Sequence, residues 1–223
     1  VYFLILLIPL SIFITGERSN FLKSIFISII LLIAISKFKR GINLKVFLTL
    51  TLITIITVSY SSENLKSRYL RTFDQINKSI EDKEKNIFIN SKHFYNYKLG
   101  YDIFKENIFF GVSTKKFRWA CKERGNLDEK MLSFGCSTHP HQTYIETLAE
   151  HGIIGFLLIF GSLILFVKYR FKEFSNKTNM VKFSAIIYLI SLWIPFLPFG
   201  SFLSTSAFSL IALNLVVARS IAN

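Results

Sequence analysis

The stretch CSTHPHQTYIETLAEHGIIG, residues 136–155, contains three of the four histidines of the chain within thirteen residues. Pro140 disfavours helix at His139 but is tolerated beside a helix start, so we expect a helix to open just after it, with Thr138 or His139 near the cap. The stretch begins polar and ends apolar, and residues 153–167 carry no charge. We therefore predict one continuous helix that starts at a membrane surface and enters the bilayer.

The composition of the chain is typical of a membrane protein. Of its 223 residues, 51% are hydrophobic, 18% are charged, and 24 are Phe. The formal net charge of +13 would suit nucleic acid, but the basic residues lie mostly between apolar segments and not along one stripe. This arrangement indicates membrane topology instead. The chain starts at Val1 without a charged leader, so we expect no signal peptide.

Apolar runs that alternate with basic connections predict an all-α polytopic membrane protein with about six transmembrane helices. We expect residues 1–60 to form three spans, residues 61–150 to form one large, mainly helical loop, and residues 151–223 to form three further spans. The connections at 37–45 and 168–182 are strongly basic and are therefore predicted to be cytoplasmic. The large loop would then lie on the opposite side, and both chain ends would lie in the cytoplasm.

The run HPHQTYIETLAEHGIIGF, residues 139–156, resembles the signature of the O-antigen ligase and polymerase superfamily. In that signature a histidine followed by Asn, then Tyr-Leu, then Glu-x-Gly-x-x-Gly ends a large periplasmic loop. Gln142 stands where the family usually has Asn, and His151 stands where a small residue is common. Because members have about twice this number of spans, the resemblance implies the C-terminal half of a protein of the bacterial inner membrane.

The resemblance implies a membrane glycosyltransferase that moves a glycan from a polyprenyl-pyrophosphate carrier to an acceptor hydroxyl at the periplasmic face. The acceptor would be a lipid A core sugar, a growing polysaccharide or a protein side chain. The attacking hydroxyl needs a base, and the departing pyrophosphate needs fixed positive charge. Histidine suits the first requirement and arginine the second. No cofactor is expected, because the donor arrives already activated.

His141 aligns with the functional histidine of the family and is the predicted catalytic base. A lone histidine here would instead be a helix-start residue bonded to a nearby carbonyl. His139 is expected to bind substrate, as are Tyr144 and Glu150 of the same motif, whereas His151 is as readily an interface residue. Three clustered histidines raise the question of zinc, but no i, i+4 pair is present among them, so we expect no metal.

Arg18, between the first two apolar runs, resembles the Gly-Ser-Arg of the family at the same topological place and is predicted to be catalytic. Its alternative role is that of a snorkelling anchor at a helix end. Arg68 and Arg118 are expected to bind substrate, although basic residues of a loop are commonly just solvated. His93 is also expected to bind substrate, because many members carry an Arg there, ahead of a Gly-Val-Gly turn. That turn is Gly111-Val-Ser113 in this chain.

Cys121 and Cys136 are the only two cysteines, and both lie in the predicted outer loop. In an oxidising periplasm we expect them to form a disulfide, which would be worth roughly 3 kcal/mol for a closed loop of about 15 residues. The alternative is two free thiols that never meet.

Two other function classes stay open. A transporter or flippase of lipid-linked sugars would use broken helices or charged residues at mid-membrane, whereas most polar groups here collect in one loop. A structural membrane subunit without chemistry is the third possibility, and the His-Pro-His motif argues against it.

Overall fold

In the computed structural model, every regular element of the described residues is helical and no strand is found among them, which agrees with the predicted all-α class. The chain divides into two compact units, Val1–Glu84 and Lys85–Asn223. The structure describes Ile194, scattered residues between 45 and 74, and the ranges 2–15, 17–38, 92–125, 127–173, 180–192 and 200–220.

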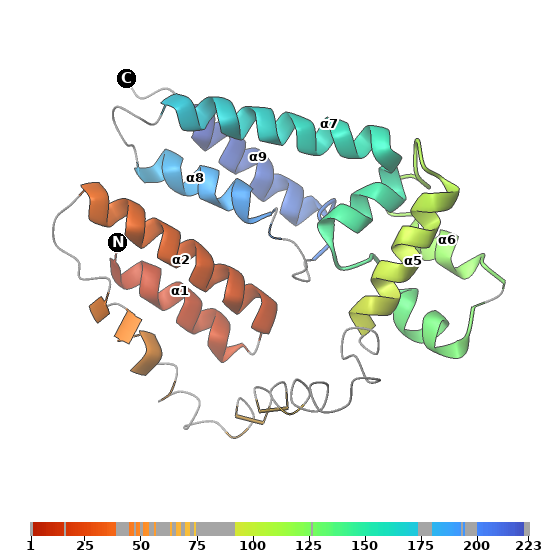
Figure 1. The fold of residues 1–223 in the computed structure, drawn as a ribbon, viewed down its shortest axis with the longest axis horizontal. Helices are drawn as coiled ribbons and strands as arrows, with labels where there is room; N and C mark the ends of the chain where they lie inside the picture. Colours follow the sequence, from red (N-terminus) through yellow and green to blue (C-terminus); the bar gives the residue numbers. More distant parts are fainter. Residues whose placement is uncertain are drawn as a thin grey trace. The chain divides into compact units, whose positions relative to one another are not determined.

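A helical hairpin opens the N-terminal unit (Figure 1). Its helices α1 (Tyr2–Ile14) and α2 (Arg18–Phe38) pack side by side, as the first two apolar runs predict. The rings of Phe13 and Phe21 meet beside the turn, with centroids 5.0 Å apart. Lys23 is buried in the second turn of α2, so the second apolar run is not free of ionisable side chains.

The structure places Arg18 in a helix, whereas two other predictions for the N-terminal unit lie mostly or wholly outside the described residues. Arg18 is the first residue of α2 and therefore belongs to the helix and not to the turn before it. Most of the third predicted span, residues 46–60, lies outside the described residues, as does Arg68.

The second unit begins with three short elements that correspond to the predicted outer loop. They are α5 (Lys92–Glu106), α6 (Phe117–Lys122) and the π-helical turn η1 (Met131–Gly135). The three pack together, and α5 and α6 also pack against α7 (Thr143–Glu173). Residues spaced four apart on α5 face a common core. The buried apolar members of this core are Leu99, Ile103, Phe117, Cys121 and Ala149.

Helix α7 is bent, and the prediction of one continuous helix is therefore wrong. At Gly152 the backbone has φ 64° and ψ −168°, which is not helical, and two helical segments meet there (Figure 1). The start of the helix also differs from the prediction. The cap is Gln142, whose side-chain oxygen accepts a hydrogen bond from the Ile145 N–H at 2.8 Å, and neither Thr138 nor His139 caps it.

The bend is made by a crossing of two backbone segments, residues 108–113 and 149–154. Both segments carry glycine at the crossing, because a Cβ on Gly111 would overlap the backbone of Glu150 and a Cβ on Gly152 would overlap the Phe109 carbonyl. Four hydrogen bonds join the segments: Val112 N to Ala149 O (3.0 Å), Ser113 N to Glu150 O (2.8 Å), Ile153 N to Ile108 O (2.7 Å) and Ile154 N to Phe109 O (3.3 Å).

After the bend, the second segment of α7 shares an apolar core with α8 (Met180–Ser191) and α9 (Thr205–Arg219), and the three helices lie near one another in Figure 1. Their common core is apolar: Leu163, Val167, Ala185, Ile186, Leu189, Leu192, Phe202, Ile211 and Ala218.

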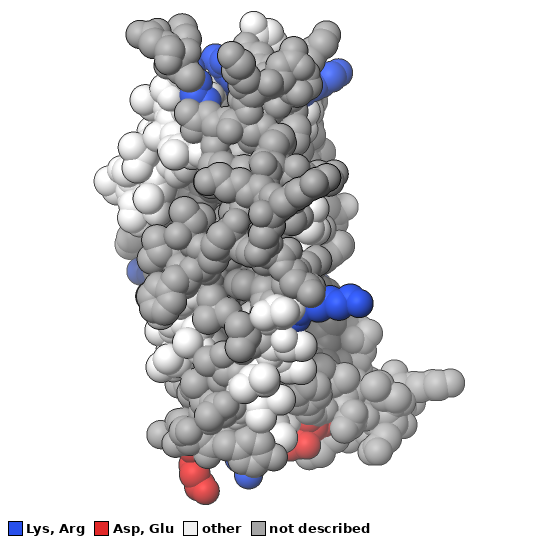
Figure 2. Space-filling model, turned by 90° about the vertical axis from the view of Figure 1, so that its left-hand side faces the viewer, with Lys and Arg blue, Asp and Glu red and all other residues white. Residues whose placement is uncertain are grey.

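One helical stretch among the described residues, Thr143–Arg170, is long and apolar enough to cross a membrane, with a mean hydropathy of 2.1 over its most apolar window. Shorter apolar helices cover Ser19–Ile33, Val181–Ser191 and Thr205–Arg219. On the face drawn in Figure 2, few of the described side chains are charged. These features agree with the membrane class, while the number of six spans stays a prediction.

Candidate functional site

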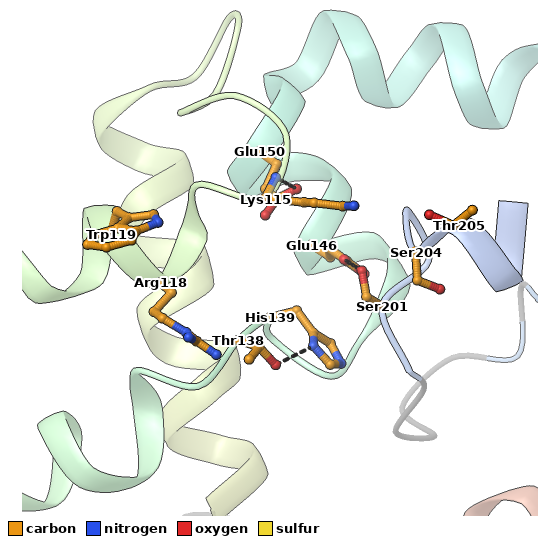
Figure 3. Close-up of a pocket in the computed structure, with 10 residues that line it drawn as sticks. All are labelled: Lys115, Arg118, Trp119, Thr138, His139, Glu146, Glu150, Ser201, Ser204 and Thr205. Atoms are coloured by element: carbon orange, nitrogen blue, oxygen red, sulfur yellow. Dashed lines mark hydrogen bonds between the residues drawn. The ribbon is translucent and has the colours of Figure 1, made fainter.

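An open pocket of about 470 Å³ lies beside the first segment of α7 (Figure 3). Its volume falls within the range of small-ligand sites. The wall is built from the segment after Gly111, α6, the loop before α7, the first segment of α7, and the loop into α9. The lining residues are Lys115, Arg118, Trp119, Thr138, His139, Glu146, Glu150, Ser201, Ser204 and Thr205.

One wall of the pocket is cationic. Lys115 follows the Gly111 crossing with a φ of 60°, and Arg118 stands in the first turn of α6. Both side chains are exposed. Figure 3 shows that the Lys115 side chain extends into the pocket and that the Arg118 guanidinium extends toward Thr138. The predicted substrate-binding residue Arg118 is therefore on the pocket wall, next to a lysine that the motif did not single out.

Glu150 fixes the backbone of this cationic wall. Its side chain is only 1% exposed. One carboxylate oxygen accepts the Lys115 N–H at 2.7 Å and the other accepts the Phe117 N–H at 3.4 Å, at the start of α6. A buried carboxylate is costly unless it is hydrogen-bonded, and these two N–H groups supply the bonds. The sequence predicted that Glu150 contacts substrate; the structure shows it lining the pocket while it holds Lys115 and α6.

Glu146 fixes the opposite wall in the same way. It is also 1% exposed, and its two oxygens accept hydrogen bonds from Ser201 Oγ and from the Phe202 N–H, the latter at 2.8 Å. This pins the loop before α9 against α7. The loop brings the hydroxyl groups of Ser201, Ser204 and Thr205 to the pocket.

Three histidines from two separate segments come together at this site. His139 lines the pocket, and its ring centroid lies 4.1 Å from that of His141. The His141 ring lies 6.0 Å from that of His93 at the start of α5. Thr138 Oγ1 lies 2.9 Å from His139 Nδ1 (Figure 3). The predicted base His141 thus contacts the pocket histidine but is not itself among the lining residues.

The surroundings of His93 are aromatic. His93 is exposed, and its ring centroid lies 6.1 Å from that of Tyr97, one turn further along α5. Burial raises the pKa of Tyr97 to about 12. Tyr97 therefore holds its proton at neutral pH more firmly than a solvent-exposed tyrosine does.

The disulfide between Cys121 and Cys136 links two walls of the pocket. It joins α6 to the end of η1, with the two Cα atoms 5.5 Å apart. Cys121 lies one turn after Arg118, and Cys136 directly precedes the segment of His139. Ser137 Oγ lies 2.5 Å from the carbonyl oxygen of His139 and shapes that segment further. The disulfide therefore limits how far the arginine and the histidine can move apart.

Tyr144 packs among aromatic rings that join the two segments of α7. Its ring packs 5.0 Å from that of Phe160, and Phe160 in turn stacks on Phe202 at 6.0 Å. Tyr144 lies before the bend of α7 and Phe160 lies after it, so this aromatic cluster braces the bend. Tyr144 is not among the pocket-lining residues, although the sequence predicted that it binds substrate.

The remaining predicted site residues lie elsewhere or outside the description. Arg18 belongs to the N-terminal unit, and its side chain is outside the described part of the chain. His151 Nε2 lies 3.0 Å from Thr114 Oγ1, at the bend and not in the pocket. Within the described residues, no group of three or more His, Cys, Asp or Glu is arranged to hold a metal ion.

Sequence reasoning missed Glu146, Lys115 and the hydroxyl residues of the pocket. Glu146 lies four residues before Glu150 and therefore on the same helix face, which was the available signal that both carboxylates are buried together. The loop into α9 gave no such signal, because its serines meet α7 only through the tertiary fold.

The fold and the pocket define a helical protein in which a membrane-span candidate adjoins a site with cations, histidine and hydroxyl groups. A family model described as O-antigen ligase matches residues 2–160, which is more than half of the chain. The chain therefore belongs to the O-antigen ligase family, and the resemblance found in residues 139–156 is confirmed. Comparisons with curated proteins and with solved structures gave no significant match.

Membership of this family has consequences for class and location. The family is of the O-antigen ligase and polymerase type, acts in polysaccharide biosynthesis, and is typically membrane-bound. The chain is accordingly a glycosyltransferase-like protein, whose substrates are in general terms a lipid-linked glycan and an acceptor.

Proposed function

We propose that the protein transfers a glycan from a polyprenyl-pyrophosphate carrier to an acceptor hydroxyl at the periplasmic face of the bacterial inner membrane. The observation that carries this proposal is the meeting of Lys115, Arg118 and His139 in one pocket. Family membership supports the same class of reaction. The acceptor is a lipid A core sugar, a growing polysaccharide or a protein side chain.

The cationic wall binds the pyrophosphate of the donor. The planar guanidinium of Arg118 matches two phosphate oxygens at once, and the ammonium of Lys115 adds a point charge. As the bond between the anomeric carbon and the phosphate oxygen breaks, its electron pair stays on the pyrophosphate. Both cations stabilise the charge that develops on this leaving group. Glu150 supports them indirectly, by holding the backbone of Lys115 and α6.

His139 serves as the base in this proposal. The acceptor oxygen attacks the anomeric carbon, and its proton passes to the imidazole of His139. Thr138 Oγ1, which lies 2.9 Å from Nδ1 of His139, orients the ring for this role. His141 acts as a positioning residue, because its ring packs on that of His139. Ser201, Ser204 and Thr205 offer hydrogen bonds to the sugar hydroxyls of a substrate.

The predicted topology completes the proposal. Residues 61–150 form the periplasmic loop with the active site, and residues 1–60 and 151–223 supply three spans each. Arg18 and Arg68 are proposed to add positive charge for the donor, Arg18 as a catalytic residue and Arg68 as a substrate-binding one. Their part is supported by the family resemblance and not by the described geometry.

The test is glycan transfer in cells that lack the endogenous enzyme and carry the full-length protein at equal membrane expression. We expect His139→Ala and Arg118→Ala each to lower transfer by about 100-fold or more, with lipid-linked glycan accumulating at the outer face. Lys122→Ala is the matched control, because Lys122 is exposed on α6 but does not line the pocket. It should transfer normally.

The same assay separates the competing assignments. If His141→Ala abolishes transfer while His139→Ala retains it, His141 is the base and the assignment of His139 is wrong. If lipid-linked glycan accumulates at the inner face in the defective variants, the protein is a transporter and the proposed reaction is wrong.

A further inference from the structure

The turn that follows α5 exposes three consecutive large apolar side chains. Ile108, Phe109 and Phe110 are 47%, 65% and 76% exposed. A run of this kind is unusual on a surface that faces water, where exposed apolar side chains are normally scattered singly.

The exposure does not come from a loosely held loop. Gly111 N donates to the Asn107 carbonyl at 2.9 Å and closes the turn. The Ile108 and Phe109 carbonyls accept hydrogen bonds from α7 directly after its bend, at 2.7 Å and 3.3 Å. The backbone of the turn is therefore fixed to α7, and its side chains are held outward.

The apolar surface of the turn continues onto the second segment of α7. Ile154, Leu157 and Leu158 are exposed there, and residues 153–167 carry no ionisable group. This segment is the apolar part of the stretch that is long enough to cross a membrane. The turn thus lies at the end of that part, at the level where the helix changes from apolar to polar.

We propose that the turn Asn107–Gly111 is an interfacial anchor whose Phe109 and Phe110 side chains enter the bilayer beside the outer end of the second segment of α7. Phe and other large apolar side chains gain free energy by leaving water at the boundary between headgroups and acyl chains. The occupant of this surface is the lipid of the membrane that α7 crosses.

The anchor would set the height of the pocket above the membrane. The segment that leaves the turn is bonded to α7 through Ser113 N and Glu150 O at 2.8 Å, and it continues directly to Lys115. A fixed depth of the turn therefore fixes the depth of the cationic wall. This inference rests on the membrane association of the family and does not depend on which glycan is transferred.

The test places single spin labels on the full chain in lipid vesicles. Because the disulfide uses both cysteines of the chain, an introduced cysteine provides the labelling site. The variants are Phe109→Cys and Phe110→Cys, with Leu158→Cys as the lipid reference. Leu132→Cys is the water reference, since Leu132 is 51% exposed on η1, away from the bend. Labelled variants are used only when the disulfide is intact and the elution volume equals that of the wild type.

Power saturation then compares collisions with oxygen, which concentrates in lipid, and with a water-soluble nickel chelate. We expect the oxygen-to-nickel ratio at positions 109 and 110 to be several-fold higher than at 132 and close to that at 158. A ratio at 109 and 110 equal to that at 132 would overturn the proposal. Low collision rates with both reagents, together with dipolar broadening that vanishes on dilution with unlabelled protein, would show that a second copy of the protein covers the turn. That result would also overturn the proposal. Glycan transfer is not part of this readout, so its outcome is independent of the proposed reaction.

Discussion

The two segments of α7 differ in what they bury. Before the bend, Thr143–His151 buries two glutamates, and every carboxylate oxygen of these glutamates accepts a hydrogen bond. After the bend, the helix exposes Leu157 and Leu158 and has no ionisable group up to Val167. A surface helix of a water-soluble protein does the reverse: it buries apolar side chains and exposes charged ones. The comparison shows that one helix can serve two environments when a backbone crossing separates them, and Gly152 is the boundary.

The largest expected effect comes from the boundary itself. Gly152→Ala places a Cβ against the Phe109 carbonyl in a left-handed conformation, so we expect it to lower the free energy of unfolding by roughly 4 kcal/mol. Denaturant titration of the protein in detergent micelles measures this. Gly161→Ala is the control, because a Cβ there meets nothing within 4 Å; it should change the free energy by less than about 1 kcal/mol. Equal effects at the two positions would show that the crossing does not form.

The second largest effect concerns the disulfide, which joins two walls of the pocket on the polar side of Gly152. The double variant Cys121→Ala/Cys136→Ala should lose roughly 3 kcal/mol, because the unfolded chain regains the entropy of an open loop. Wild-type protein treated with a reductant is the matched comparison and should shift its unfolding midpoint by the same amount. A midpoint that is unchanged in both would mean that the linkage between α6 and the His139 segment is not needed for the fold.

The third effect tests whether the buried carboxylate of Glu150, in the first segment of α7, stabilises the fold. Glu150→Gln replaces one acceptor oxygen by an N–H₂ group that faces a backbone N–H, so the variant should be about 2 kcal/mol less stable. Glu106→Gln is the matched control, because Glu106 is exposed and pairs with Arg124, and its change should stay below about 1 kcal/mol. Similar small losses in both variants would contradict a structural role for Glu150.

The smallest effect tests the other segment of the crossing, residues 108–113. Ser113 has a φ of 83°, where a side chain is strained. Ser113→Gly should therefore raise the free energy of unfolding by about 1 kcal/mol. Ser133→Gly, which lies in η1 without a positive φ, should lower it instead. Destabilisation by Ser113→Gly would show that this residue does not adopt the left-handed conformation.

The sequence predicted the classes of element well and their junctions less well. The hairpin of α1 and α2 and the apolar second half of α7 follow from apolar runs, because such runs report directly on burial or lipid contact. The bend of α7 was missed, since Gly152 looks like an ordinary helical glycine until residues 108–113 cross it. The cap at Gln142 was also missed, because glutamine is not one of the residues that commonly cap a helix N-terminus.

The same division holds for the site. The motif placed the histidines and Glu150 within a short segment, and local spacing is enough for that. It favoured His141 as the base, whereas His139 is the histidine that lines the pocket and His141 has a left-handed backbone with φ 57°. The cysteine pair was expected from composition, and the structure contains the disulfide between α6 and the His139 segment.

By itself, the sequence determined the membrane-protein composition, the family and the stretch that carries the chemistry, because each of these is written in residue types at short range. The tertiary structure alone decided which groups share the pocket. Lys115 and Ser201 lie far in the chain from the segment of His139 and Glu146. The three parts meet because a glycine crossing bends α7 and because buried carboxylates bind the backbone of two distant loops. Long-range hydrogen bonds of this kind leave no periodic pattern in a sequence.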